Sequence, residues 1–350
     1  MKEGRRRPPG GREGPARRIR RSRARARALA RVCRAAALLL ALLWAGAVTA
    51  DAPPPPPQIS ARIEASPSPE EAERLWLEAV SLERRTVVDG PEGVETAVAR
   101  LERAGRLFQA LTTRHKRYPA AHWRSGRSYW LAGEALPVEL TERRLEYYHL
   151  AKQMSALGLA ADADCAECML WKFIAMGRIR TTEGGWGSFA DLKEMARLLD
   201  RAIALDPQYR DDDHNSTLGN LHYSSAIFYR IFPDWFWIGW ALGVRGDKER
   251  AYRHARTALA LHPMRLDYRI EIGAQLLCLG ETRDDAVRLE RGKAVMRAAR
   301  RETPTSEYEQ RELAAVRIML AHPEKACGYS GDTWLEIDQD AARQAARGGG

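Results

Sequence analysis

The chain has 350 residues and a formal net charge of +10, from 56 Lys and Arg against 46 Asp and Glu. The first fifty residues hold 14 of the basic and two of the acidic residues, so residues 51–350 have a net charge of −2. A body this close to neutral excludes the overall basic balance that is typical of a nucleic-acid-binding protein, and we expect no nucleic acid as partner.

Residues 1–50 are predicted to target the chain for export. The Arg-rich stretch Arg17–Arg34 precedes the apolar run Ala35–Val48, and Val48-Thr49-Ala50 resembles a signal-peptide cleavage site. The run is shorter than the roughly 20 residues that span a bilayer comfortably. We expect a cleaved signal peptide or an uncleaved inner-membrane anchor whose basic end stays in the cytoplasm. Both place the body in the periplasm or another extracytoplasmic space, with membrane contact only through this segment.

A Pro-rich linker over residues 51–67 separates this segment from a helical body over residues 68–325. Pro53–Pro57 favours polyproline II, and Ser68-Pro69-Glu70-Glu71 is typical of a helix start. No window alternates with a period of two, so strands are not expected. Residues 326–350 are expected to be a poorly ordered tail. The expected helices beyond residue 140 fall in four pairs: Glu142–Leu157 with Asp164–Ile179, Phe189–Leu205 with Asn215–Ile231, Lys248–Leu261 with Leu266–Leu279, and Asp284–Arg301 with Ser306–Leu320.

A short repeat indicates how these helices are arranged. Ala202–Pro207 and Ala258–Pro263 both read as Ala, an aliphatic residue, Ala, Leu, a polar residue and Pro, and Leu218-Gly219 and Ile272-Gly273 follow at similar distances. Pro ends one helix and the small Gly lets two helices pack closely. This order of residues is the sequence pattern of tetratricopeptide repeats. The fold class predicted is therefore all-α, a tetratricopeptide-like helical-hairpin solenoid that acts as an interaction module.

The region from about residue 120 to 300 resembles the T-component family of tripartite ATP-independent periplasmic (TRAP) transporters, and is similar to the related regulator-of-microtubule-dynamics repeat proteins. The resemblance depends on the order of the following residues: Leu218-Gly219, Tyr223, Pro233, Gly239, Gly246-Asp247, Ala251, Ala258-Leu259, Pro263, Ile272, Leu276 and Gly280. It implies an all-helical extracytoplasmic protein that pairs with a periplasmic solute-binding protein or a small apolar ligand and can form homo-oligomers. It implies no catalytic residues and no cofactor.

Four of the five cysteines lie in the body. The spacing of Cys165 and Cys168 allows a disulfide in an oxidising compartment, while zinc would require a second pair at similar spacing. Cys278 and Cys327 stand far apart in the sequence, so we expect no metal site. A redox function would require a thioredoxin-like strand–helix–strand setting, which the sequence does not show.

The sequence shows few signs of a metal-binding or catalytic site. Asp211-Asp212-Asp213-His214 precedes a predicted helix, and the dipole of a helix favours carboxylates before its start. The segment lacks the residue spacing of a calcium-binding loop. The histidines form no metalloprotease pattern, and no nucleophile elbow, phosphate-binding loop or dinucleotide fingerprint occurs. We expect that the chain is not an enzyme.

An aromatic insert is the candidate binding site. The two repeat prolines are separated by more than one repeat, and the excess includes Ile231–Trp240, of which Trp235, Phe236, Trp237 and Trp240 form the aromatic cluster. Aromatic side chains dominate binding hot spots, but they also fill repeat cores, and both readings remain open. Trp186 and Trp171 precede the same hairpin and are added to the candidate site. The alternative function is a secreted or membrane-tethered envelope scaffold with no transport role.

Overall fold

The computed structural model describes Glu70, Arg74, Leu77 and residues 90–114, 120–183, 189–212, 215–232, 234, 245–304, 307–330 and 333–334. The chain divides into two compact units, Met1–Ala61 and Arg62–Gly350, and every described residue belongs to the second. The expected signal segment, the linker and most of the aromatic insert, including Trp235, Phe236, Trp237 and Trp240, lie outside the described residues. None of the described helices is both long enough and apolar enough to cross a membrane.

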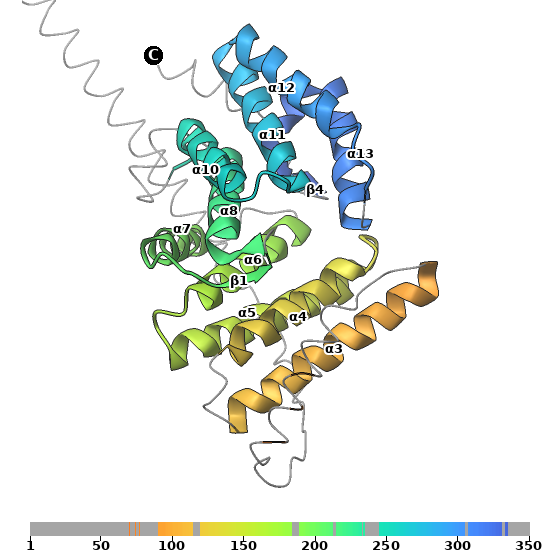
Figure 1. The fold of residues 1–350 in the computed structure, drawn as a ribbon, viewed down its shortest axis with the longest axis vertical. Coiled ribbons are helices and arrows are strands. Elements are labelled where there is room, and N and C mark those ends of the chain that lie inside the picture. The colour runs from red at the N-terminus through yellow and green to blue at the C-terminus, as the bar shows by residue number, and fades with distance from the viewer. Residues whose placement is uncertain are drawn as a thin grey trace, which may run out of the picture. The chain divides into compact units, whose positions relative to one another are not determined.

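The second unit is a succession of antiparallel helices (Figure 1), which confirms the predicted all-α, tetratricopeptide-like class. The helices are α3 (Gly90–Arg114), α4 (Ala121–Ala135), α5 (Thr141–Ala161), α6 (Ala166–Glu183), α7 (Phe189–Ala204), α8 (Thr217–Ile231), α10 (Lys248–Leu261), α11 (Leu266–Arg283), α12 (Ala286–Ala299) and α13 (Glu307–Ala321), followed by the 3₁₀-helix η1 (Pro323–Gly328).

The helices form two layers. The inner layer consists of α4, α6, α8, α11 and α13, and each of these helices contacts the next one in that order. Helices α5, α7, α10 and α12 alternate with them as the outer layer. Helix α8 packs far more on α10 than on α7, so the hairpins are α8–α10 and α11–α12. Three of the sequence-based pairs were therefore wrong by one helix: Phe189–Leu205 with Asn215–Ile231, Lys248–Leu261 with Leu266–Leu279, and Asp284–Arg301 with Ser306–Leu320.

The glycines of the repeated Leu-Gly and Ile-Gly pairs lie at points of close packing, as the tetratricopeptide pattern predicts. A side chain at Gly219 on α8 would meet the ring of His262 at 2.7 Å, and one at Gly273 on α11 would meet Met296 of α12 at 2.9 Å. Each glycine therefore allows the following turn or helix to approach closely. Side-chain caps fix the helix starts nearby, since Ser216 accepts from the amide of Gly219 and Asp247 from that of Arg250.

The hydrophobic core runs along the stack as overlapping clusters. Val98 of α3, Tyr129 of α4 and Met154 of α5 belong to the first cluster, and α6, α7 and α8 supply most of the second. The third joins α11 to α13 and the C-terminal segment, and it includes Cys278 and Tyr329. Each hairpin buries its apolar face on the next, which is how repeat arrays gain stability.

The structure has two short antiparallel hairpins where the sequence predicted no strands. Strand β1 (Arg210–Asp212) pairs with β2 (Asn215–Ser216) between α7 and α8, and β3 (Tyr329–Ser330) pairs with β4 (Thr333–Trp334). Strands of two or three residues are too short to produce an alternating pattern. They lie in the connections and do not change the fold class.

The beginning of the predicted tail is ordered. We call residues 323–330, which follow α13, the C-terminal strap. Ala326, Cys327 and Tyr329 are buried, and the strap contacts α8, α11 and α13, all in the inner layer. The expectation of a poorly ordered tail from residue 326 was wrong for residues 326–330, because a disulfide and a buried arginine hold this segment on the helices.

Candidate functional site

The predicted aromatic site is described only in part. Trp235, Phe236, Trp237, Trp240 and Trp186 lie outside the described residues. The residues that flank the insert are fixed on α8 and α10. Phe232 is buried and stacks on Phe228 with ring centroids 5.7 Å apart, and the amide of Asp247 donates to the carbonyl of Tyr229. The described residues on either side of the insert therefore belong to one hairpin, α8–α10.

Trp171, the remaining predicted aromatic, is 8% exposed and lies on α6. It packs with Trp123 and with Trp130 of α4, whose ring centroid is 5.4 Å away. Arg127 lies 5.7 Å from its ring centre. Trp171 thus belongs to a packed aromatic cluster between two inner-layer helices, and the structure does not bring it together with the described ends of the insert.

The structure has two disulfides. Cys165 and Cys168 are joined at the start of α6, with the Cα atoms 5.2 Å apart. Cys278 of α11 is joined to Cys327 of the strap, 49 positions along the chain. Both sulfur-bearing residues of this second pair are buried. The distance between these two cysteines in the sequence argues against a second zinc pair, but it gives no information on their distance in the fold, so the sequence did not predict this disulfide.

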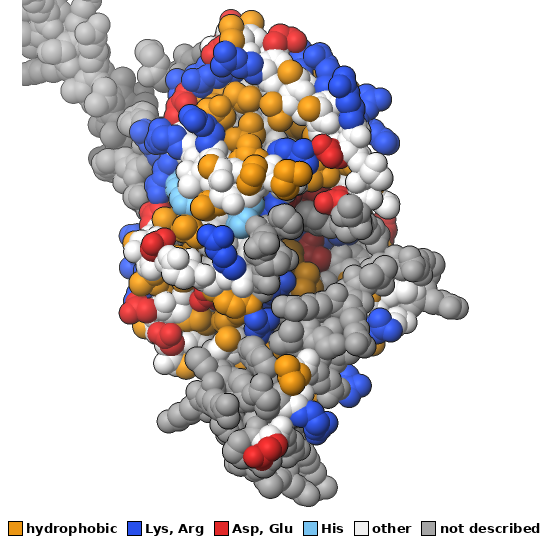
Figure 2. Space-filling model, in the orientation of Figure 1, with side chains coloured by type: hydrophobic (Ala, Val, Ile, Leu, Met, Phe, Trp, Pro, Cys, Tyr) orange, Lys and Arg blue, Asp and Glu red, His pale blue; other side chains and the backbone are white. Residues whose placement is uncertain are grey.

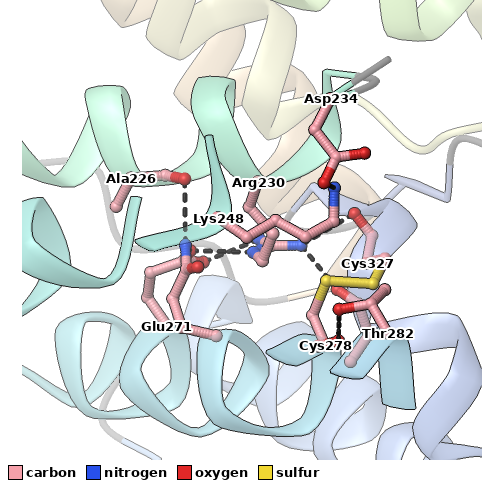
Figure 3. Close-up of a disulfide and its surroundings, with 10 residues drawn as sticks. Ala226, Arg230, Asp234, Lys248, Glu271, Cys278, Thr282 and Cys327 are labelled. Carbon is pink, nitrogen blue, oxygen red and sulfur yellow. Dashed lines mark hydrogen bonds and ion pairs between the residues drawn. A yellow bond between two sulfur atoms is a disulfide. The ribbon is translucent and has the colours of Figure 1, made fainter. Parts of the chain in front are cut away.

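A buried ion pair lies beside this disulfide (Figure 3). Arg230 of α8 donates from Nε and Nη2 to the two carboxylate oxygens of Glu271 on α11, at 2.9 and 2.8 Å. Both side chains are inaccessible to solvent. The guanidinium also donates from Nη1 to the main-chain carbonyls of Ala326 at 2.5 Å and Cys327 at 3.3 Å. One arginine therefore holds α8, α11 and the strap together.

Lys248, at the start of α10, faces the same region. Its ammonium lies 3.6 Å from the carboxylate of Asp234, at the start of the aromatic insert. Burial lowers the pKa of Lys248, and Asp234 opposes that shift. The pair fixes the first described residue beyond Phe232 to the helix that follows the insert.

A second buried carboxylate joins the two ends of the stack. Glu134 of α4 pairs with Arg178 of α6 at 2.9 Å and accepts from the hydroxyl of Tyr148 at 2.7 Å. Arg178 also donates to the carbonyl of Ser330, 152 positions away, and Arg311 of α13 donates to the carbonyl of Glu134, 177 positions away. The last helix and the strap are thereby bonded to α4 and α6.

A histidine pair joins α8 to α10. The Nδ1 atoms of His222 and His254 are 2.8 Å apart, and Arg250 donates from Nε to Nε2 of His254 at 3.4 Å. Because Nε2 of His254 accepts, its proton must be on Nδ1 and be donated to His222. Burial lowers the pKa of both rings, and that of His254 falls to about 4 with help from His222 and Arg250.

Metal ligation has little support in this part of the chain. Within the described residues, no three His, Cys, Asp or Glu side chains gather as a metal would require. Asp211 and Asp212 belong to β1, while Asp213 and His214 lie outside the description. No acid, base and nucleophile converge among the buried networks above, whose members are paired with one another.

The comparisons with known proteins fit this architecture. Residues 95–231, from α3 to the end of α8, match the family model for regulator of microtubule dynamics protein 1-3. No curated protein matches the chain. The similarity to regulator-of-microtubule-dynamics proteins, expected from the sequence, is thus confirmed for this region. The chain contains a tetratricopeptide-like helical domain that is similar, over residues 95–231, to the regulator-of-microtubule-dynamics family.

Proposed function

We propose that this chain is a protein-interaction module that works outside the cytoplasm and has no catalytic activity. The observation that carries the proposal is the stack of helical hairpins, of which residues 95–231 match a tetratricopeptide-like family model. Stacked hairpins bury their apolar faces on each other and offer extended surfaces to partners. The buried charged groups Arg230, Glu271 and Glu134 are occupied in holding helices together.

An extracytoplasmic location is supported by two features. The Arg-rich, apolar start of the sequence is typical of an export signal or anchor. Two disulfides, Cys165–Cys168 and Cys278–Cys327, suit an oxidising compartment and are rare in the cytosol. We therefore propose that the signal delivers the helical unit to the periplasm, with or without cleavage.

The finer proposal is a role like that of a TRAP-transporter T component, which associates with a periplasmic solute-binding protein or a small apolar ligand. It is supported by the order of Leu-Gly, Pro, Gly-Asp, Ala-Leu and Pro residues between positions 218 and 263. The aromatic insert is the proposed contact, because it carries three tryptophans and begins and ends at the α8–α10 hairpin. Aromatic anchors are the usual hot spots of such interfaces.

The test is a pull-down from envelope extract with Asp51–Gly350, which contains the whole compact unit Arg62–Gly350. Wild type is compared with Trp235→Ala/Trp237→Ala and with Leu140→Ala/Leu157→Ala, a control that removes two exposed leucines at the start and near the end of α5. We expect a solute-binding protein with wild type and the leucine control, and none with the tryptophan variant.

Two other outcomes are informative. Equal recovery of a solute-binding protein with all three proteins would support the proposed interaction. It would also indicate that the two tryptophans pack in the core of the stack and do not contact the partner. Recovery of no solute-binding protein would remove the transport role, and the envelope-scaffold function would then be the better account. A homo-oligomer would appear in the same preparation as a larger hydrodynamic mass in size-exclusion chromatography with light scattering.

A further inference from the structure

The near-neutral charge of the body conceals a strongly basic outer surface. Helix α10 has four Lys or Arg and one Glu, and α12 has the same composition, so each has a formal charge of +3. Residues 51–350 as a whole carry −2. In Figure 2, Lys and Arg side chains surround the hydrophobic surface over the part of the stack where Figure 1 places α10, α11 and α12.

Four arginines define what we call the basic face: Arg253 and Arg256 of α10, Arg291 of α12, and Arg301 just after it. All four are exposed. Arg253 lies two positions from the buried Ala251 and Ala255, and therefore on the opposite side of its helix. Their positions direct these guanidinium groups away from the core.

Side-chain contacts join α10 to α12, so the four exposed arginines lie on adjoining parts of the outer layer. Arg288 of α12 forms an ion pair with Glu249 of α10 at 2.6 Å. Val295 of α12 packs in the same cluster as Tyr252 and Leu259 of α10. These contacts hold the outer sides of α10 and α12 in register.

The arginines of the basic face have no acidic partner among the described residues, although three carboxylates stand within four positions of them in the sequence. Glu249 is occupied by Arg288, Glu290 by Lys293 at 2.9 Å, and Glu302 by Arg269 at 2.8 Å. Four uncompensated guanidinium groups on one rigid surface produce a local positive potential that attracts anions. Such a potential is not explained by the packing of the stack.

Exposed apolar side chains accompany these charges. Val287 is 62% exposed and lies one turn before Arg291 on the same side of α12. Met264, in the turn after α10, is 69% exposed. Arginines beside exposed aliphatic groups suit the boundary between lipid headgroups and acyl chains, because the charges can bind phosphates while the aliphatic groups enter the apolar layer. An acidic protein surface could be bound by the charges alone.

We propose that the basic face of α10 and α12 is a docking surface for an anionic phospholipid membrane. Arg253, Arg256, Arg291 and Arg301 bind lipid phosphates, and Val287 and Met264 enter the headgroup layer. This contact is separate from the partner interaction proposed above and does not depend on it. It would lay the outer layer on the membrane and leave the inner layer directed away from it.

The test is cosedimentation of Asp51–Gly350 with vesicles of phosphatidylcholine, alone or with about 30 mol% phosphatidylglycerol. We compare wild type, the quadruple variant R253Q/R256Q/R291Q/R301Q, and a control with the same charge loss, R100Q/K193Q/R197Q/R317Q, on α3, α7 and α13. Wild type and control should bind only the anionic vesicles. The quadruple variant should bind at least about 100-fold more weakly.

The salt dependence of vesicle binding by wild type is an independent test that needs no variant. At about 0.5 M NaCl, where the Debye length falls to roughly 4 Å, the binding of wild type should be lost. Binding of wild type that does not respond to salt would overturn the proposal even if the quadruple variant failed to fold. So would equal binding of wild type to neutral vesicles, equal binding of the quadruple variant, or no binding at all. Capture of an acidic envelope protein through these arginines, without vesicle binding, would replace the membrane by a protein partner.

Discussion

Arg230 and Glu271 form a two-pronged ion pair that is completely buried, between α8 and α11. Glu271→Gln removes one charge and leaves Arg230 uncompensated, which costs about 3–5 kcal/mol of folding free energy in comparable cases. We expect a loss of that size in urea-induced unfolding. Arg230→Met/Glu271→Leu removes both charges and should be less destabilised than the sum of the two single variants.

The matched control is the exposed pair Arg143–Glu95, which has similar bidentate geometry at 2.7 and 2.9 Å. Glu95→Gln should leave the unfolding midpoint unchanged within error, because solvent screens such a pair. A neutral result for Glu271→Gln as well would contradict the view that the buried pair fixes α8 on α11.

The two disulfides should differ in their contribution to stability. Cys278–Cys327 closes a loop across 49 positions, so Cys278→Ser/Cys327→Ser should lower the free energy of unfolding by about 2–5 kcal/mol. Cys165–Cys168 closes only three positions, and Cys165→Ser/Cys168→Ser should have a much smaller effect. Denaturant unfolding of both double variants without reductant checks the order. The reverse order would show that loop closure is not the main contribution.

Acidification should weaken the α8–α10 contact through the histidine pair. Burial lowers the pKa of His222 and takes that of His254 to about 4, so the His254 ring is neutral in the folded state near pH 5. The unfolded rings take up protons below their ordinary pKa of about 6.5. The free energy of unfolding should therefore fall as the pH decreases from about 6.5 toward 4.

The pair His222 and His254 can be isolated from other titrating groups by substitution. His254→Gln should flatten the pH dependence between about pH 6.5 and 5, above the range where most carboxylates titrate. At pH 8, where the histidines are neutral in both states, the difference from wild type reports only the lost packing. An unchanged slope in the variant would show that other groups produce the pH dependence.

Two glycines in helix interiors should respond to alanine in opposite directions. A Cβ atom at Gly280 of α11 would lie 2.8 Å from the main-chain nitrogen of Leu289, which cannot move without shifting α12. At Gly177 of α6 the nearest contact is the terminal methyl of Met195, at 3.7 Å. Gly280→Ala should destabilise the protein by about 1–3 kcal/mol, and Gly177→Ala should stabilise it by up to about 1 kcal/mol.

Thermal unfolding of both glycine variants is sufficient as a measurement. Gly273 provides an intermediate case, because its obstacle is the flexible side chain of Met296. If Gly280→Ala were as stable as Gly177→Ala, α11 and α12 would have to be less closely packed than the structure indicates.

Local patterns predicted the helices well where caps and breakers mark their ends. The expected helix Lys248–Leu261 coincides with α10, because Asp247 caps its start and Pro263 follows its end. Contacts between distant residues could not be predicted in this way. Arg230 and Glu271 are 41 positions apart, and nothing in the sequence around either residue identifies its partner. The basic face was also missed, because acidic residues elsewhere cancel its charge in the total.

The strap and α13 change how the stack should unfold. A linear repeat array has contacts only between neighbours, so its ends can melt while its middle remains folded. Here Arg311 and Arg178 bond α13 and Ser330 to residues more than 150 positions away, and Cys327 is covalently joined to α11. Fraying of α13 and the strap alone would break the hydrogen bonds of Arg311 and Arg178, and the disulfide of Cys327 opposes it. The helical unit should therefore melt in one cooperative transition, as a closed domain does.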